Sequence, residues 1–171
     1  SMNSEWVSLI QQNTMDGWHY FQDNGKKTGW DIKDGDLTFT SANAKGKGDK
    51  SLVSDKEYTS FKIHLEWKVS PGSNSGFFWG VKEDEKYEFP FVTGPEIQIL
   101  DPKNPDGPLT QAGALYGMIA PSEWVTNPAG EWNSYDITIN HNVNKGTVVH
   151  NGTKIVEFPL SGDEWDAMVE P

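Results

Sequence analysis

The stretch Gly94–Asp101 reads Gly-Pro-Glu-Ile-Gln-Ile-Leu-Asp. Its proline can begin a strand but cannot lie inside the hydrogen-bonded ladder, and the residues after it alternate between polar and apolar. This period of two predicts a strand with both isoleucines on one face and Glu96 and Gln98 on the other. Because a rigid strand positions functional groups better than a loop does, this polar face, with Asp101 at its end, is a candidate site. An ordinary solvent-exposed face is the competing interpretation.

On either side of this stretch, short segments rich in aromatic and β-branched residues recur between glycine and proline turns. The expected strands span residues 17–21, 30–32, 36–40, 51–53, 61–69, 77–81, 112–119, 135–141, 146–149 and 154–158. Asp34-Gly35 and Asn151-Gly152 are typical of two-residue hairpin turns. Helical periodicity is almost absent, apart from one turn at 163–168. We therefore predict an all-β fold, a two-sheet antiparallel sandwich, in one domain over residues 1–171.

Composition narrows the classes of partner. The chain has 171 residues, eight of them tryptophan, and a net charge of −11. All 14 cationic side chains are lysines. A nucleic-acid-binding protein needs a basic surface, and none is visible here. Without arginine, bidentate clamps on phosphate or carboxylate cannot form. An acidic surface rich in aromatic residues suits a neutral polyhydroxylated ligand, and sugars fit that description.

The sequence carries no cysteine, which excludes disulfides and thiolate chemistry without fixing the compartment. No apolar run approaches the length of a membrane span, and no signal peptide is visible.

Several motifs occur in an order that identifies a family resemblance. They are Gly17-Trp18-His19, Glu66-Trp67-Lys68, Asn74-Ser75-Gly76, Glu96–Asp101, Gly113–Tyr116, Pro128–Asn133 and Asn151-Gly152. Together they cover nearly the whole chain, and the chain resembles the 3-keto-disaccharide hydrolase family, formerly a domain of unknown function. The resemblance implies a concanavalin-like jelly roll, similar to that of β-glucanases. It also implies activity on 3-keto-glycosides by lyase or hydratase steps. The implied location is periplasmic or extracellular, in some cases as a lipoprotein, and the implied lineage is the polysaccharide-degrading Bacteroidetes.

The chain departs from this family at its end. Family members continue past Trp165 with a segment that ends in a Gln-Asp-His-Gly motif and a final strand, whereas this sequence stops at Pro171. We therefore expect a domain truncated at its C-terminus that lacks the last strand of the jelly roll. The sheet edge left open would favour self-association between chains.

The chemistry that the resemblance implies needs particular groups. A 3-keto group acidifies the hydrogen on C2, so a base, an acid near the glycosidic oxygen and a group that stabilises the enolate are required. We assign Glu96 as acid, base or metal ligand, Glu66 as the second carboxylate, Lys68 as the enolate stabiliser and His150 as a further base or ligand. Glu66 and Lys68 share one strand face, which we expect to meet the face of Glu96. Competing interpretations are an exposed charge pair and an ordinary strand histidine.

Substrate contacts are expected from polar and aromatic side chains near these groups. Gln98 would orient the sugar, and Tyr116 and Trp124 could stack on its apolar face. Asn74 and Asp101 are the other expected substrate-binding residues. For Asn74 and Asp101 local turn chemistry is the simpler interpretation. A divalent metal ion is a candidate cofactor, but no pair of histidines has ligand spacing, so the metal and its ligands stay unassigned.

Two functions are consistent with these sequence features. The first is a carbohydrate-active hydrolase or lyase that acts on 3-keto-glycosides, with a keto-sugar or oligosaccharide as partner. The alternative is a non-catalytic carbohydrate-binding domain, which would carry an aromatic platform without a convergent acid, base or metal.

Overall fold

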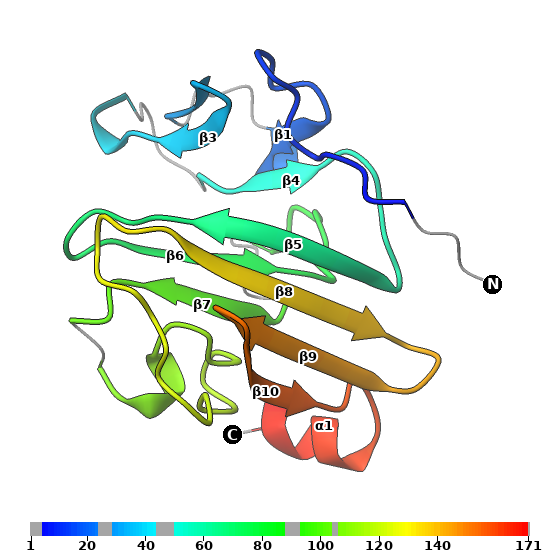
Figure 1. Ribbon diagram of the computed structural model, residues 1–171. Coiled ribbons are helices and arrows are strands. Elements are labelled where there is room, and N and C mark those ends of the chain that lie inside the picture. The colour runs from blue at the N-terminus through cyan, green and yellow to red at the C-terminus, as the bar shows by residue number, and fades with distance from the viewer. Residues whose placement is uncertain (1–4, 24–28, 44–49, 88–92, 104–105, 171) are drawn as a thin grey trace. The chain divides into compact units, whose positions relative to one another are not determined.

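The computed structural model describes residues 5–23, 29–43, 50–87, 93–103 and 106–170. The chain forms two compact units (Figure 1). The first unit contains the described residues up to Glu57 together with Lys82–Tyr87, and the second contains Tyr58–Val81 and the described residues from Thr93 to Glu170. The elements are β1 Trp18–Tyr20, β2 Trp30–Lys33, β3 Asp36–Phe39, β4 Leu52–Ser54, β5 Phe61–Trp67, β6 Asn74–Phe78, β7 Glu96–Leu100, β8 Asn133–Asn140, β9 Lys145–His150, β10 Thr153–Phe158 and α1 Asp163–Val169.

The first unit contains two antiparallel strand pairs. β1 pairs with β4, and β2 pairs with β3. The β2–β3 turn is Asp34-Gly35, whose φ angles of 52° and 80° match the left-handed turn that this dipeptide favours. Trp30 and Phe39 face each other across the pair with ring centroids 5.3 Å apart. The predicted hairpin is therefore confirmed, because its turn residues adopt the required positive φ angles at low cost.

An ion cluster in the first unit joins three segments that are far apart in sequence. His19 Nδ1 lies 2.7 Å from an oxygen of Asp55, and its Nε2 lies 2.6 Å from an oxygen of Glu83. Burial acts to lower the pKa of His19, but the hydrogen bonds to Glu83 and Asp55 outweigh it and raise that pKa above its ordinary value. The remaining oxygen of Glu83 accepts a hydrogen bond from the backbone N–H of Gln22. The cluster thus ties the segment at Glu83 to β1 and to the end of β4.

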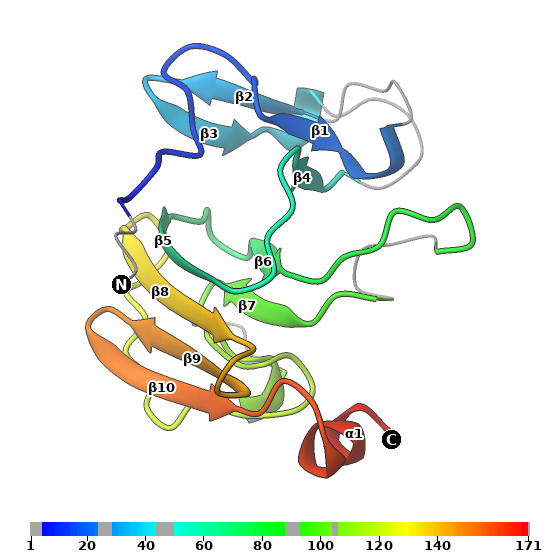
Figure 2. The same ribbon diagram turned by 90° about the vertical axis from the view of Figure 1, so that its right-hand side faces the viewer.

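The second unit is built from two antiparallel sheets, which Figure 2 shows as separate layers. One sheet has the order β10-β9-β8-β5, and the other is the pair β6-β7. The turn between β9 and β10 is Asn151-Gly152, with φ angles of 47° and 86°. Residues 114–116 run beside β7, where Leu115 forms an isolated bridge with Ile97. β7 therefore has a backbone neighbour on each side.

The core of the second unit lies between these sheets. Buried apolar residues alternate along β8, where Tyr135, Ile137 and Ile139 are fully buried. Ile97 and Ile99 of β7 belong to the same cluster. Burying these side chains supplies most of the stability that holds the sheets together, at about 1.5–3 kcal/mol for each large apolar side chain.

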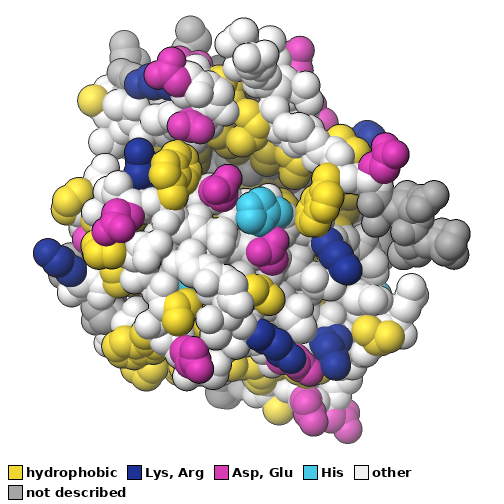
Figure 3. Space-filling model, in the orientation of Figure 1, with side chains coloured by type: hydrophobic (Ala, Val, Ile, Leu, Met, Phe, Trp, Pro, Cys, Tyr) yellow, Lys and Arg dark blue, Asp and Glu magenta, His cyan; other side chains and the backbone are white. Residues whose placement is uncertain are grey.

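The outer face of the four-stranded sheet is polar. His64 of β5 pairs with Asp136 of β8 at 2.7 Å, and both side chains are exposed. Figure 3 shows a histidine flanked by acidic side chains near the centre of this view, with further charged side chains among neutral ones. Alternation along these strands thus separates an apolar inner face from a wet outer face, as the sequence pattern predicts.

The predicted all-β class is confirmed, since strands in several antiparallel sheets dominate and the described residues contain one short α-helix. Most expected strands agree with the observed ones to within two residues at each end, and two of them differ more. The strand expected at 77–81 is β6, which begins at Asn74, and residues 112–119 form isolated bridges in place of a regular strand. The segment at 112–119 departs from a strand because glycines with positive φ at 113 and 117 break its extended backbone. No helix in the described ranges is long and apolar enough to cross a membrane.

Tyr135→Phe tests the contact between the two sheets. The Tyr135 hydroxyl donates a hydrogen bond to the Gln98 carbonyl at 2.5 Å, and that carbonyl also accepts from Gly113 N–H at 2.9 Å. Because the carbonyl keeps one donor, we expect a loss of about 0.5–1.5 kcal/mol in the free energy of unfolding, measured by urea denaturation. Tyr58→Phe, at an exposed position, is the control and should be neutral. Equal stabilities of both variants would contradict a bond across the core.

His19→Gln tests the ion cluster through the pH dependence of thermal stability. Because folding raises the pKa of His19 above 6.5, its contribution is complete below pH 6.5 and is lost as pH rises through the raised pKa. We expect the wild type to exceed the variant by about 0.5–1 kcal/mol at pH 6, after allowance for solvent screening, and this advantage to shrink above pH 7. His141→Gln, at an exposed position, is the control. An advantage that grows with pH would contradict the ion-pair explanation.

Candidate functional site

Three neighbouring segments of the second unit build one surface around β7. In the β6–β7 register, Phe78 lies opposite Glu96 and Gly76 lies opposite Gln98. Directly opposed residues of an antiparallel pair point to the same face, and the Ile97–Leu115 bridge extends this rule to residues 114 and 116. The face opposite to the core isoleucines, here called the Glu96 face, carries Asn74, Gly76, Phe78, Glu96, Gln98, Leu100, Ala114 and Tyr116.

Glu96 is the chemically distinctive group of this face. It is half-buried at the start of β7, and burial raises its pKa to about 7. In the part of the chain that the structure describes, its carboxylate makes no hydrogen bond or ion pair. Its backbone carbonyl accepts a hydrogen bond from Tyr116 N–H at 2.9 Å, which fixes the main chain at this point. A carboxyl group that titrates near neutrality on a fixed backbone can both take and give a proton.

Gln98 lies two residues further along the same face. Only 2% of it is exposed, and its Nε2 donates to the Thr110 carbonyl at 3.1 Å. Its Oε1 is buried without a hydrogen-bond partner among the described residues. A buried acceptor left unpaired costs about 1–3 kcal/mol, so a donor from a ligand or water would be favourable here. Gln98 is therefore a polar group held in place with one acceptor unused.

Tyr116 provides an aromatic surface beside Glu96. Its side chain is 45% exposed, although its backbone is bonded to β7. Gly117 N–H bonds to the Leu109 carbonyl, and Leu109 is also exposed. Asn74, at the far end of β6, is exposed as well. The Glu96 face thus combines the carboxyl group of Glu96, the side-chain amides of Gln98 and Asn74, and the aromatic ring of Tyr116.

His150 lies in the core of the second unit instead. It is 1% exposed, with Nδ1 donating to the Ser134 carbonyl and Nε2 accepting from the Thr126 hydroxyl, both at 3.0 Å. Its ring stacks on the Trp67 ring with centroids 5.9 Å apart. It also packs edge-to-face against the Tyr135 ring, with centroids 4.7 Å apart. Burial lowers the pKa of His150, which favours the neutral ring. With both nitrogens bonded, its geometry fits a structural position.

Glu66 and Lys68 are not brought to the Glu96 face. Both are exposed at the end of β5, where they alternate with Leu65 and Trp67, which pack into the core. The expected meeting of the two polar faces does not occur, because each faces away from the core between the sheets. Lys68 Nζ instead lies 4.9 Å from the ring centre of Trp132.

Asp101 and Trp124 occupy other positions. The carboxylate of Asp101 accepts from Gly72 N–H at 2.8 Å and from Lys103 N–H at 3.0 Å. These hydrogen bonds lower the pKa of Asp101, and they give it the turn-stabilising position that the sequence offered as the simpler interpretation. Trp124 is 66% exposed in a loop and makes no hydrogen bond or ring contact with the described residues of the Glu96 face.

Sequence reasoning missed two contributors to this face. The sequence suggests that Gly76 belongs to a turn, although a glycine inside a strand can also signal the close approach of another group. Thr110, which binds Gln98 through its backbone carbonyl, ends a short 3-10 helix, Pro108–Thr110, and gives no signal of its own. Within the described ranges, no group of three or more His, Asp or Glu side chains is arranged to hold a metal ion.

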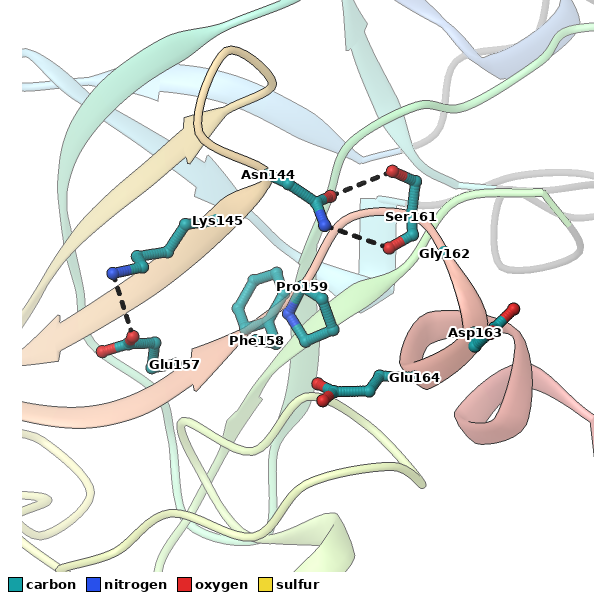
Figure 4. Close-up of a pocket in the computed structure, with 9 residues that line it drawn as sticks. All are labelled: Asn144, Lys145, Glu157, Phe158, Pro159, Ser161, Gly162, Asp163 and Glu164. Carbon is teal, nitrogen blue, oxygen red and sulfur yellow. Dashed lines mark hydrogen bonds and ion pairs between the residues drawn. The ribbon is translucent and has the colours of Figure 1, made fainter.

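A separate pocket lies between the end of the β9–β10 hairpin and α1 (Figure 4). Lys145 and Glu157 pair at 3.2 Å, and Asn144 exchanges hydrogen bonds with Ser161. These polar groups therefore satisfy one another, and none of the residues predicted for the site lines this pocket. The Glu96 face is the stronger candidate site.

Comparison with known proteins gives concordant matches. A family described as the 3-keto-alpha-glucoside-1,2-lyase-like domain matches residues 5–170. A 3-keto-disaccharide hydrolase of Bacteroides thetaiotaomicron is 30% identical over 187 aligned positions. These cover 96% of this chain and 62% of the relative, so the chain spans less than two thirds of that protein.

Solved structures are similar as well. Two crystal structures of candidate glycosyl hydrolases from Parabacteroides distasonis match with TM-scores of 0.85 and 0.70. The first is 30% identical and covers 95% of this chain and 76% of its own, and the second is 27% identical and covers 91% and 73%. Because the family match extends over residues 5–170, nearly the whole chain, the chain belongs to the family of 3-keto-alpha-glucoside-1,2-lyase-like domains.

Proposed function

We propose that the chain acts on 3-keto-glycosides and that Glu96 is the group that moves the proton. The observation that carries this proposal is the half-buried Glu96 carboxyl, without a bonded partner among the described residues and with a pKa raised by burial to about 7. The family supplies the substrate class, since the Bacteroides thetaiotaomicron relative is a 3-keto-disaccharide hydrolase. An ordinary surface glutamate would be ionised at neutral pH and would have little driving force to return a proton.

The reaction begins at C2 of the keto sugar, whose hydrogen is acidified by the C3 carbonyl. The Glu96 carboxylate removes this proton, and the C2–H electron pair moves into the C2–C3 bond while negative charge develops on the C3 oxygen. When the C3 carbonyl re-forms, C1 and C2 become doubly bonded and the C1–O glycosidic bond breaks. The departing oxygen takes a proton, which the Glu96 acid can supply. For net hydrolysis, the oxygen of water then bonds to C1 and a proton returns to C2.

Neighbouring groups would bind and orient the sugar. The exposed ring of Tyr116 can cover the apolar face of a pyranose, and its hydroxyl is a donor for the developing enolate oxygen. The unpaired Oε1 of Gln98 can accept a hydrogen bond from a sugar hydroxyl. Because Gln98 is buried, the side chains around it would have to move to admit the sugar. Glu66, Lys68 and His150 take no step in this mechanism, because they lie on the outer face of β5 or in the core.

We also propose that the two sheets of the second unit belong to a concanavalin-like jelly roll. Support comes from their antiparallel pairing and from the TM-score of 0.85 to a solved relative. The strand order around a complete jelly roll would be tested by an experimental structure of a longer chain. A sheet order that places β7 at an outer edge would contradict this proposal.

A sugar-binding domain without catalysis is the second candidate. Two exposed tryptophans favour it, Trp124 at 66% and Trp132 at 46% exposure, because exposed aromatic rings are the usual platforms for sugars. This function requires no proton transfer, so substitution of Glu96 would leave it intact.

Glu96→Gln tests the catalytic role. With a 3-keto-disaccharide as substrate and release of the free sugar as readout, we expect kcat/KM to fall by about 100-fold or more. Glu123→Gln, an exposed carboxylate in a loop, should match the wild type. Glu66→Gln should also retain activity, and its loss would restore the role that the sequence suggested. Unchanged release by Glu96→Gln would refute the assignment, and sugar binding without release by any variant would favour the second candidate.

The pH profile tests the direction of proton transfer. Because the base must be ionised, kcat/KM should rise as pH increases through about 7, the raised pKa of Glu96, and then level off. A Glu96→Asp variant, if active, should show a displaced rise. The same assays with a chelator determine whether a divalent metal contributes. A rate that falls through pH 7 would mean that Glu96 acts first as an acid.

A further inference from the structure

Gly76 is glycine for a reason that its backbone does not explain. It lies inside β6, opposite Gln98, and it is not among the residues with positive φ. Any amino acid could adopt its extended conformation. Glycine inside a strand weakens it, because the flexible residue loses more entropy on folding and packs no side chain. The requirement must therefore come from space on the side where a Cβ would point.

That space is filled by the Glu96 side chain. A Cβ placed on Gly76 would overlap Oε2 of Glu96 and would lie 2.8 Å from its Cδ and 3.0 Å from its Cγ. Carbon atoms in ordinary contact lie about 3.5–4.0 Å apart, so the two side chains cannot coexist in these positions. Glu96 thus lies diagonally across β6, with its carboxylate over the Gly76 backbone.

The other described glycines in close contact serve a different purpose. A Cβ on Gly146 would overlap the ring of Phe158, and one on Gly113 would overlap the side chain of Ile155. Both of those contacts are apolar and help to close the core. Gly76 differs because it accommodates an ionisable group, and packing a carboxylate against backbone carries a desolvation cost that apolar packing does not.

The surroundings on this face are largely uncharged. Phe78, Gln98, Leu100 and Ala114 are neutral, and so is Asn74, while Tyr116 is the titratable neighbour contributed by the three segments. No lysine or histidine shares the face within these described segments. Within these segments the carboxylate therefore has no cation to hold it over β6, and the shape of the strand provides its place.

We propose that Gly76 is the positioning residue of the Glu96 face: its missing side chain forms the recess that holds the Glu96 carboxylate over β6. The part of this inference that concerns catalysis rests on the proposed function, whereas the recess itself does not. Alanine at this position should push the carboxylate out of the recess and toward water. A better solvated carboxylate ionises more easily, which agrees with the burial that raises the pKa of Glu96.

A carboxyl NMR titration tests the recess without reference to activity. Wild type, Gly76→Ala and Gly107→Ala, where a Cβ meets nothing within 4 Å, are compared, and the Glu96 signal is assigned by its absence in Glu96→Gln. We expect the Glu96 midpoint to fall by about 1–2 pH units in Gly76→Ala, toward the ordinary glutamate value, and to stay in place in Gly107→Ala. A midpoint that moves by less than about 0.3 unit, or equally in both variants, would overturn the proposal.

A double-mutant cycle covers the case in which Gly76→Ala is poorly stable. The clash is with the far end of a flexible side chain, which can turn away at a modest cost, so we expect this variant to melt about 1–4 °C below the wild type. Glu96→Ala removes the atoms that clash, so adding Gly76→Ala to that variant should cost little or nothing. Gly107→Ala, where a Cβ meets nothing within 4 Å, controls for the general effect of replacing a glycine. An equal loss in both backgrounds would overturn the proposal, because the clash would then lie with another group.

Kinetics then connect the recess to the proposed reaction. If Glu96 is the base, Gly76→Ala should lower kcat by about 10-fold or more and move the rise in kcat/KM to lower pH, while Gly107→Ala keeps the wild-type profile. If Glu96→Gln keeps full activity, the proposed function fails, yet the titration and the cycle still decide whether the recess exists. A wild-type profile in Gly76→Ala, with a shifted NMR midpoint, would overturn the positioning role alone.

Discussion

The contact on which the second unit depends is the packing of β8 against β7, with the Tyr135 hydroxyl bonded to the Gln98 carbonyl across the core. Tyr135 is fully buried, so its hydroxyl must find a partner inside the protein, and burial raises its pKa far above the ordinary range. The partner it finds is the backbone of the strand that carries the candidate site. This hydrogen bond, together with the apolar packing around it, therefore fixes the position of β7 relative to the four-stranded sheet.

Backbone constraints on β7 continue from this point. All of these are backbone hydrogen bonds. The Gln98 carbonyl also accepts from Gly113 N–H, and Gln98 N–H donates to the Ala114 carbonyl. The Glu96 carbonyl accepts from Tyr116 N–H. β6 completes the ladder on the other side. Because both edges of β7 are bonded, the side chains of Glu96 and Gln98 project from a main chain that has little freedom to move. This rigidity is what a proton-transfer group needs, since catalysis depends on a fixed distance to the reacting atom.

Family membership and the geometry of the Glu96 face are complementary. The family connects the chain to keto-sugar chemistry, and the face supplies a carboxyl group that titrates near neutrality. The chain covers 62% of the length of this hydrolase relative. Periplasmic or extracellular location, a missing C-terminal strand, the single domain over 1–171 and self-association through an open edge stay predictions. They concern the whole protein and its setting more than the packing of the described residues.

The sequence was sufficient for features that depend on neighbours along the chain. Alternation identified β5, β7 and β8, and Asn151-Gly152 identified the hairpin between β9 and β10, because period and turn conformation are local properties. The polar pair on β7 was visible for the same reason. Which faces meet was not visible, because alternation assigns two faces to a strand without saying which one enters the core. The pattern alone therefore groups Glu66 and Lys68 with Glu96, although the packing of Leu65 and Trp67 turns them away. The burial of His150 and the recess at Gly76 also arise from contacts between residues distant in sequence, so they emerge when the sheets pack together.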